Sequence, residues 1–375
     1  MDIIRDSSSD FTTKTCHGRW MSEDYDPGLV SVIIPSYNRV NFLPETLESV
    51  KFQTYRPIEL IVIDDGSTDN TKLLIDQWIA TSRQDSRFSI RYFYQDNKGA
   101  PAARNIGLIE SNGEYIQYLD SDDVLHPMKI EIHVAALNLS PKCDYVWSEY
   151  KVFKSIEELL FTQYNIEDLL TCETLMVTAE VMKIPNTGWS GLYRRNLCVL
   201  TGPWNENLAR WQDFEYNVRS AYLRPRSRYI SACLHFWRHH GTGRIENLKK
   251  SPEGIQKAFD SLDAVKNFLQ NNGLDTIYIR NEIVRYYFLI MRQAMKAGTP
   301  EQVYAAINGA HEQKLGRNLR LKLNLIKFMF SNFGGGCSLF AFDAYGIIMI
   351  NLSRILGLFK SSKNKKISRL DSFSS

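Results

Sequence analysis

The sequence lacks several features that would point to common classes of protein. Its six cysteines are scattered, with no Cys-x-x-Cys spacing, which argues against a zinc cage or a disulfide framework and fits a reducing cytosol. A formal net charge of +3 over 375 residues gives no reason to expect a nucleic-acid partner. The first thirty residues are polar and acidic, without the apolar core of a signal peptide. No charge-free apolar run reaches the roughly 20 residues of a membrane span, so we expect no clean transmembrane helix.

Two clusters of aspartate stand out, each directly after a run of strand-forming residues. They are residues 64–65 and 120–123. Carboxylates at the carboxyl end of a parallel strand face the crevice where α/β sheets bind ligands. Crowded carboxylates repel one another unless a cation or hydrogen-bond donors offset the charge. Asp120, Asp122 and Asp123 therefore suggest a hard divalent ion, Mn²⁺ or Mg²⁺, which takes oxygen ligands. The alternative for either cluster alone is a solvated acidic turn.

The hydrophobic pattern alternates between strands and helices through the first 140 residues. It predicts strands at 30–34, 60–63, 89–94 and 115–119, and helices at 41–52, 67–79, 99–110 and 127–139. This order predicts an α/β fold, with a Rossmann-like, mostly parallel sheet and helices on both faces. A further strand is expected at 144–153, followed by a mixed, loop-rich region. We expect a flexible leader at 1–28, a catalytic domain at 29–245 and a helical C-terminal region at 246–375.

Several motifs occur in an order that resembles family 2 glycosyltransferases, which have the GT-A fold. The resemblance covers residues 30 to about 240 and rests on the ordered set of motifs. It implies an enzyme that transfers a sugar from a nucleotide diphosphate sugar to an acceptor hydroxyl, usually with inversion. The motifs include Pro35-Ser36-Tyr37-Asn38, Asp64-Asp65-Gly66-Ser67, Ala103-Arg104-Asn105 and Asp120-Ser121-Asp122.

The resemblance places five of these residues around the nucleotide. It implies that Asp65 accepts a hydrogen bond from a uracil-type N–H, which favours a UDP-sugar donor. Asp64 would orient the loop or reach the ribose. Pro35 and Tyr37 would line the nucleoside pocket, although packing explains Tyr37 equally well. Arg104 would serve a phosphate or the aspartate cluster, because a guanidinium binds both bidentately.

The resemblance also implies a metal site around the second aspartate cluster. Asp122 would bind the Mn²⁺ or Mg²⁺ ion directly, and Asp120 would hold the ribose or a metal-bound water, with Ser121 between them. The ion would act as a Lewis acid on the diphosphate. Arg238 and His240 resemble the family's Arg-x-His, so Arg238 would contact the diphosphate and His240 would contact it or ligate the metal.

An inverting transfer needs a carboxylate that takes the acceptor's proton. Residues 210–219 resemble the family's Glu-Asp segment that opens a helix. Gln212 stands at the first of its two acid positions, which leaves Asp213 as our candidate for the base. The alternative is that Asp213 only caps a helix. Trp189 and Trp211 are expected on the acceptor side, since tryptophan faces suit sugar rings or lipid. Ordinary core packing remains open for both.

Residues 322–360 carry a dense apolar set interrupted by Asp343 and Arg354, with lysines within and beside it. Such a pattern resembles interfacial helices on an anionic membrane leaflet. It therefore suggests a cytoplasmic protein that is peripheral on the inner face of the cell membrane. The alternative is a helix pair packed on the protein or in an oligomer.

Three classes of function compete at this point. The first is an inverting glycosyltransferase in surface polysaccharide or glycolipid assembly, acting on a sugar or lipid-linked acceptor. The second is a non-catalytic nucleotide-sugar-binding scaffold. A nucleotidyltransferase is the third, but it would need a glycine-rich loop near the first strand, and residues 35–39 contain no glycine. The sugar, the acceptor and the linkage are not decided by the sequence.

Overall fold

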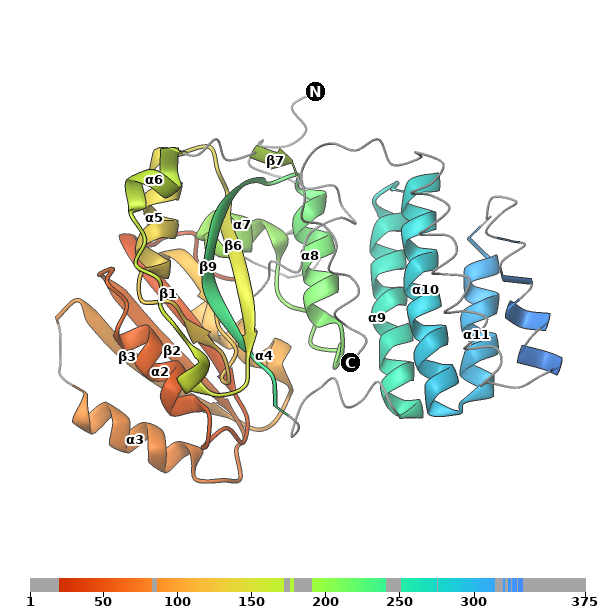
Figure 1. The fold of residues 1–375 in the computed structure, drawn as a ribbon, viewed down its shortest axis with the longest axis horizontal. Coiled ribbons are helices and arrows are strands. Elements are labelled where there is room, and N and C mark those ends of the chain that lie inside the picture. The colour runs from red at the N-terminus through yellow and green to blue at the C-terminus, as the bar shows by residue number, and fades with distance from the viewer. Residues whose placement is uncertain are drawn as a thin grey trace. The chain divides into compact units, whose positions relative to one another are not determined.

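The computed structural model describes residues 20–82, 86–171, 176–178, 191–240, 251–274 and 276–313, and positions 320, 323–324, 326–328 and 330–332. The chain forms two compact units (Figure 1). The first comprises Met1–Asn247 and Lys257–Asp275, and the second comprises Leu248–Gln256 and Thr276–Ser375. The predicted aspartate clusters and the rest of the candidate site belong to the first unit.

The first unit is built on one mixed sheet, whose nine strands all lie in the described part of the chain. Their order is β3-β2-β1-β4-β8-β6-β9-β5, with β7 beside β9. Strands β1 to β4 are parallel to their neighbours within that group, and β6 is parallel to β9. Strands β5, β7 and β8 pair only in antiparallel fashion. The strands are β1 (Asp26–Ser36), β2 (Ile58–Asp65), β3 (Phe88–Gln95), β4 (Gly113–Tyr118), β5 (Val124–Leu125), β6 (Tyr145–Phe153), β7 (Met176–Thr178), β8 (Leu192–Arg194) and β9 (Arg226–Arg238).

Helices alternate with the first strands, as the sequence pattern predicts. In the described chain these are α2 (Leu43–Lys51), α3 (Thr71–Thr81), α4 (Ala100–Glu110), α5 (Lys129–Leu139), α6 (Ile166–Thr171), α7 (Arg195–Thr201) and α8 (Gln212–Tyr222), with a short 3-10 turn η1 (Ile156–Glu158). The C-terminal helices are α9 (Pro252–Asn271), α10 (Ile277–Ala297) and α11 (Pro300–His311). The α/β class and the helical C-terminal region are thereby confirmed.

Strand β1 shows why both faces of the sheet are covered. Alternate side chains of a strand point to opposite faces. Val32 and Ile34 pack into a core shared with helices α2, α3 and α5, whereas Ile33 packs into another core with Leu108 of α4. All of these side chains are buried, and burying one of this size contributes about 1.5–3 kcal/mol. An apolar run of this kind fits a strand buried on both sides.

Helix α4 approaches the sheet closely at Gly107. A Cβ atom at this position would lie 2.3 Å from Cγ2 of Ile33, a separation that real contacts do not show. Glycine is therefore required for the helix to pack against β1. The close packing fixes α4, and with it the arginine at position 104.

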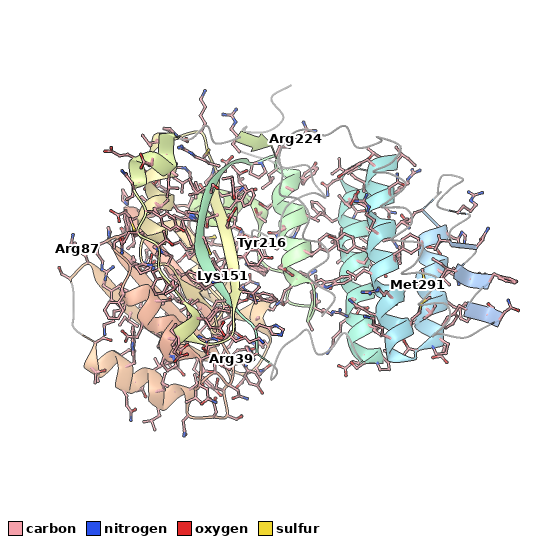
Figure 2. The ribbon with its side chains drawn as sticks, in the orientation of Figure 1. Arg39, Arg87, Lys151, Tyr216, Arg224 and Met291 are labelled. Atoms are coloured by element: carbon pink, nitrogen blue, oxygen red, sulfur yellow. The ribbon has the colours of Figure 1, made fainter. Side chains whose placement is uncertain are left out.

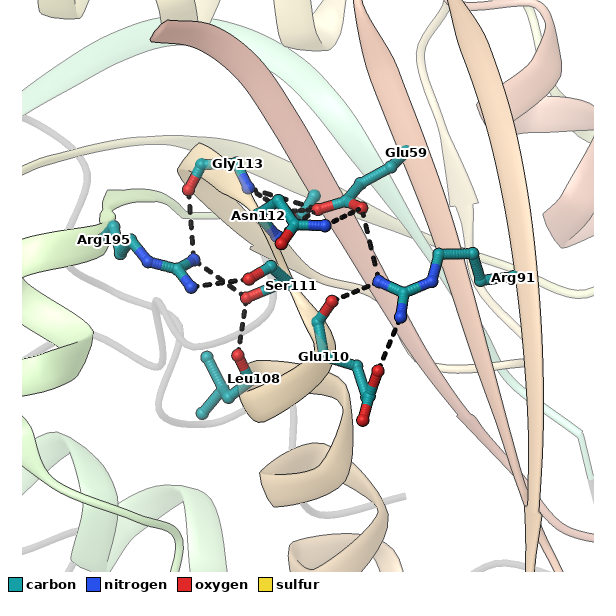
Figure 3. Close-up of polar contacts among 9 residues, drawn as sticks. Glu59, Arg91, Leu108, Glu110, Ser111, Asn112, Gly113 and Arg195 are labelled. Carbon is teal, nitrogen blue, oxygen red and sulfur yellow. Dashed lines mark hydrogen bonds and ion pairs between the residues drawn. The ribbon is translucent and has the colours of Figure 1, made fainter. Parts of the chain in front are cut away.

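A polar network ties the amino ends of the strands together (Figure 3). Glu59 of β2 is buried and accepts hydrogen bonds from the Ser31 hydroxyl and the backbone N–H of Asn112. Arg195, at the start of α7, donates to the Ser111 hydroxyl and to the Gly113 carbonyl. These contacts fasten the turn between α4 and β4 from two sides. They lie at the edge of the sheet opposite to the aspartate clusters.

The second unit contains helices α10 and α11. Helix α10 is capped at its start by the Thr276 hydroxyl, which accepts a hydrogen bond from the Ile279 N–H. Met291 in the middle of α10 is fully buried (Figure 2). Among the residues that the structure describes, no helix has the length and apolar character needed to span a membrane. The predicted interfacial tail, residues 322–366, lies mostly outside the described residues.

Candidate active site

The carboxyl ends of β1, β2 and β4 meet at one edge of the sheet, because the three strands are parallel neighbours. Asp64 and Asp65 close β2, and residues 120–123 follow β4 directly. The two clusters therefore face the crevice that α/β sheets use for ligands. Pro35 near the end of β1 is buried, and Tyr37 just after it is exposed.

The first cluster holds the loops around it. Asp65 Oδ1 accepts from Gln95 Nε2 at 2.5 Å and from the Lys98 N–H at 2.8 Å, while Oδ2 accepts from the Gly99 N–H at 2.8 Å. Its carboxylate thus fixes the loop that leads into α4. Asp64 accepts from the Tyr92 hydroxyl at 2.9 Å. Burial of Tyr92, together with this hydrogen bond, raises the pKa of its hydroxyl well above 10.

Asn38 links the loops that follow β1 and β2. Its backbone is left-handed, with φ of 52°, a conformation that asparagine tolerates better than most residues. Its Oδ1 accepts from the Thr68 N–H at 2.8 Å, and its own N–H donates to Ser67 Oγ at 2.9 Å. The two loops therefore form one braced rim above the strand ends.

Asp122 is the centre of the second cluster. Its Oδ2 lies 2.9 Å from His240 Nε2 and 3.6 Å from Arg39 Nε. The His240 ring packs on Phe42, with ring centroids 4.5 Å apart. The structure thus brings Asp122 and His240 together, and their predicted role as metal ligands stays a prediction. Arg39 was not singled out from the sequence, and no local pattern marks it, because its partner is far along the chain.

Arg238 is held firmly at the end of β9. Its Nε donates to the Asp122 carbonyl at 2.8 Å, and its Nη2 forms an ion pair with Glu45 of α2. The guanidinium also lies over the rings of Phe42 and Phe153, at 5.3 and 4.5 Å. Arg238 therefore joins α2 and β9 to the loop that carries Asp122. Its predicted contact with a diphosphate stays a prediction.

Arg104 connects the second cluster with Trp204. Its Nη2 lies 2.9 Å from Asp120 Oδ1, and its guanidinium packs over the Trp204 ring at 4.6 Å. Nε and Nη1 of Arg104 are buried and have no hydrogen-bond partner. Buried donors are nearly always paired in native proteins, because leaving one unpaired costs free energy. Arg104 therefore presents two N–H groups for which a bound acceptor is the natural partner.

Asp213 lies at the start of α8, within electrostatic reach of these groups. Burial raises the pKa of its carboxyl above 3.8, the Asp120 carboxylate raises it further, and the Arg104 guanidinium lowers it. Glu215, the other nearby acid, is committed to Arg219, whose Nε donates to it at 2.7 Å. Of the two acids in the first turn of α8, Asp213 is therefore the one that interacts with Asp120 and Arg104.

Aromatic packing fixes the helix that carries Asp213. Tyr216 of α8 (Figure 2) stacks on Trp204 with ring centroids 4.1 Å apart, and its hydroxyl lies 3.3 Å from that of Tyr118 in β4. Trp211, directly before the helix, has a left-handed backbone with φ of 53°. A bulky residue in this conformation is an outlier that the surroundings must enforce. Trp189 lies outside the described residues, so its predicted place on the acceptor side has no structural counterpart.

Asp123, the last residue of the second cluster, is buried beside other titratable side chains. Asp123 accepts hydrogen bonds from the Arg238 N–H and from His235 Nε2, both at 2.9 Å. Burial lowers the pKa of Lys129 to about 7 and lowers the pKa values of His133 and His235. Burial therefore favours the neutral forms of the two imidazoles, and that of Lys129 once the pH is above about 7.

The side chains at Asp122 are chemically suited to a divalent ion. A carboxylate oxygen and an imidazole nitrogen already meet there, and both are common ligands of Mn²⁺. No group of three or more His, Cys, Asp or Glu side chains that could hold a metal occurs among the described residues. Asp120, the other predicted ligand, is held by Arg104 instead. Ligand oxygens would have to complete the coordination shell, as substrate phosphates do in many magnesium sites.

Comparison with known proteins shows which family part of the chain resembles. Residues 31–167 match the family model described as glycosyl transferase family 2. An uncharacterized glycosyltransferase of Rickettsia felis is 48% identical over 105 residues, which cover 28% of this chain and 16% of that protein. Over residues 31–167, the chain is therefore similar to glycosyltransferase family 2. A putative glycosyltransferase of Bacillus subtilis, EpsH, is 25% identical over 250 residues, covering 65% of this chain and 70% of that protein.

The crystal structure of S. aureus TarS in complex with UDP-GlcNAc matches with a TM-score of 0.48 and 16% identity, covering 76% of this chain and 88% of that one.

Proposed function

We propose that this protein is an inverting glycosyltransferase that moves a sugar from a nucleotide diphosphate sugar to an acceptor hydroxyl. The observation that carries the proposal is the meeting of Asp120, Arg104 and Asp213 at the carboxyl edge of the parallel strands. An ion-paired arginine with two unpaired N–H groups suits an anionic donor. An acid of raised pKa beside it suits proton transfer.

Donor binding would use the rim formed by the first two loops. Asp65 already accepts three hydrogen bonds from the loop before α4, so this loop is set before any ligand arrives. A carboxylate in this place still favours a base that offers an N–H, and a UDP-sugar remains the favoured donor. Asp64 orients the turn that follows β2 by accepting from the Ser67 N–H at 2.8 Å.

The chemical step would rest on Asp213. Its carboxylate takes the proton of the acceptor hydroxyl, the acceptor oxygen forms a bond to the anomeric carbon, and the bond to the nucleoside diphosphate breaks on the opposite face. Because the acceptor oxygen attacks on the face opposite to the leaving group, the anomeric configuration is inverted. Arg104 supplies positive charge next to the base. A Mn²⁺ or Mg²⁺ ion held by Asp122 and His240 would neutralise the departing diphosphate.

The acceptor side and the cellular role extend the same proposal. The enforced backbone of Trp211 sets its side chain next to the base helix, where a tryptophan face suits a sugar ring. We propose a sugar or lipid-linked acceptor of surface polysaccharide or glycolipid assembly. Association with an anionic membrane surface through residues 322–366 is part of the proposal, and its test is binding to anionic vesicles before and after deletion from position 322. Equal binding of both forms would reject it.

A panel of nucleotide sugars tests the function directly. Purified protein is incubated with each donor and Mn²⁺ or Mg²⁺, and release of nucleoside diphosphate is measured with and without candidate acceptors. We expect one donor to be turned over, with loss of activity in excess chelator. Magnetic resonance of the product should show the inverted anomer. Tight donor binding without any turnover would instead indicate the non-catalytic scaffold.

A further inference from the structure

Arg39 lies where a ligand could replace its present partner. It stands in the loop between β1 and α2 (Figure 2), with Nε 3.6 Å from Asp122 Oδ2. Its side chain is 19% exposed and that of Asp122 is 15% exposed, so the pair reaches solvent. Arg238 and Arg104 differ from it, because they are more deeply buried and their ion pairs with Glu45 and Asp120 are shorter. Of these three arginines, Arg39 has the most exposed side chain and the longest of these ion pairs.

The backbone around Arg39 is fixed although its side chain reaches solvent. The Arg39 N–H donates to Thr71 Oγ1 at 3.2 Å, and the next N–H, that of Val40, donates to Asp69 Oδ2 at 3.2 Å. The Arg39 carbonyl accepts from the Leu43 N–H at 2.9 Å, at the start of α2. The Asn38 contacts brace the preceding residue. The guanidinium is therefore attached to a backbone that is already fixed, which limits the entropy lost when it binds a ligand.

Charge explains why the guanidinium would change partner. Without a bound metal ion, Asp122 is neutralised by Arg39 and hydrogen-bonded by His240. A divalent cation on the same carboxylate repels the guanidinium and competes with it for the oxygen. A diphosphate bound beside that cation offers the guanidinium new oxygens, and its planar fork suits a phosphate.

We propose that Arg39 is a diphosphate-binding residue that holds Asp122 while the donor is absent and transfers to the donor's phosphate when it binds. The proposal rests on the proposed function, because it presumes a nucleotide diphosphate donor at this site. Arg39 thereby provides selection for a diphosphate over a monophosphate. It also keeps Asp122 from standing as an uncompensated carboxylate in the empty site.

Equilibrium binding to Arg39→Ala tests the proposal without relying on activity. The probes are Mn²⁺ alone, and UDP, UMP and uridine in the presence of Mn²⁺, all measured by calorimetry on the full chain. We expect the Kd for UDP to rise about 10-fold or more, the usual cost of one charge-assisted hydrogen bond, with that for UMP changed less than about twofold. Mn²⁺ alone should bind at least as tightly as to the wild type, since its competitor for Asp122 is gone. Arg39→Lys should fall between, because it keeps the charge but loses the fork.

Arg87→Ala is the matched control. Arg87 is an exposed arginine directly before β3 (Figure 2), at the amino edge of the sheet and so away from the site. It should leave every Kd unchanged. An unchanged UDP affinity in Arg39→Ala would overturn the proposal while leaving the proposed function intact, provided that the wild type binds UDP. Parallel weakening of UDP, UMP and Mn²⁺ binding would overturn it too, because that pattern marks a residue that only supports the loop. A wild type that does not bind UDP in the presence of Mn²⁺ would refute the proposed function with its UDP-sugar donor.

Discussion

Substitution of Glu59 by alanine should destabilise the first unit strongly. Glu59 is only 3% exposed, and its carboxylate accepts from the Ser31 hydroxyl and from the Asn112 N–H, each at 2.5 Å. It also lies 3.8 Å from Arg91 Nη1 (Figure 3). Alanine removes the acceptor and leaves these donors in a buried place that water reaches poorly.

The magnitude follows from the number of donors left without an acceptor. Each buried donor that loses its partner costs about 1–3 kcal/mol. With the Asn112 N–H and the Ser31 hydroxyl both affected, we expect a loss of about 2–6 kcal/mol in the free energy of unfolding. Domains are commonly stable by only about 5–15 kcal/mol, so such a loss is a large share of the total.

Tryptophan fluorescence during urea denaturation isolates the relevant unit. All seven tryptophans lie before residue 248, and therefore in the first unit. The transition midpoint should fall while the m-value stays constant, as expected for a change of stability without a change in the surface exposed on unfolding. The second unit contributes no tryptophan signal to this transition.

Glu110→Ala supplies the control, because Glu110 faces the same arginine. Its Oε2 lies 2.5 Å from Arg91 Nη2, yet its side chain is 35% exposed. An ion pair of this exposure is usually worth about 1 kcal/mol or less. If Glu59→Ala costs no more than Glu110→Ala, the carboxylate contributes only an ion pair, and its buried donors do not lose stability as expected.

Three further predictions concern the site and the buried charges. Asp213→Asn should lower transfer by roughly 10²-fold or more with little change in donor affinity, and the wild-type rate should fall with decreasing pH through a pKa raised above 3.8, because the base must be deprotonated. Asp122→Ala should abolish metal-dependent turnover while circular dichroism stays native; full activity would remove the metal from the reaction. The pKa of Lys129 is about 7 in the folded protein and about 10.5 in the unfolded chain, so the unfolded chain binds more protons between these values. Wild-type stability should therefore rise with pH across that window. Lys129→Met should flatten this pH dependence. Denaturation midpoints at pH 7 and 10 check this.

The regular first half of the fold could be predicted because its signals are local. The apolar run at 60–63, followed by Asp64, predicts a strand, and the structure places β2 at Ile58–Asp65. The aspartates after β2 and β4 meet because parallel neighbours end at the same edge, a rule that needs no tertiary detail. The expected strands and helices in residues 30–139 accordingly differ from the observed ones by only a few residues at their ends.

The second half gave weaker local signals. Strand β9 covers thirteen residues, Arg226–Arg238, within a region whose composition reads as loop-rich. Its polar members Arg228 and His235 are buried because tertiary contacts pair them, with Leu170 and Asp123 respectively. Strands β5 and β8 are two and three residues long, too short for any periodicity. Their existence depends on partners that the sequence alone does not identify.

The same distinction explains which site residues the sequence analysis missed. Asp122 and His240 carry a motif, whereas Arg39 and Glu45 are recognised only through the charges that they meet in space. At the amino edge of the sheet, the buried Glu59 finds its donors within the protein. At the carboxyl edge, Arg104 keeps two buried N–H groups without a partner. Since an unpaired buried donor costs free energy that a ligand would recover, the cost at Arg104 is itself an argument that the carboxyl edge is a binding site.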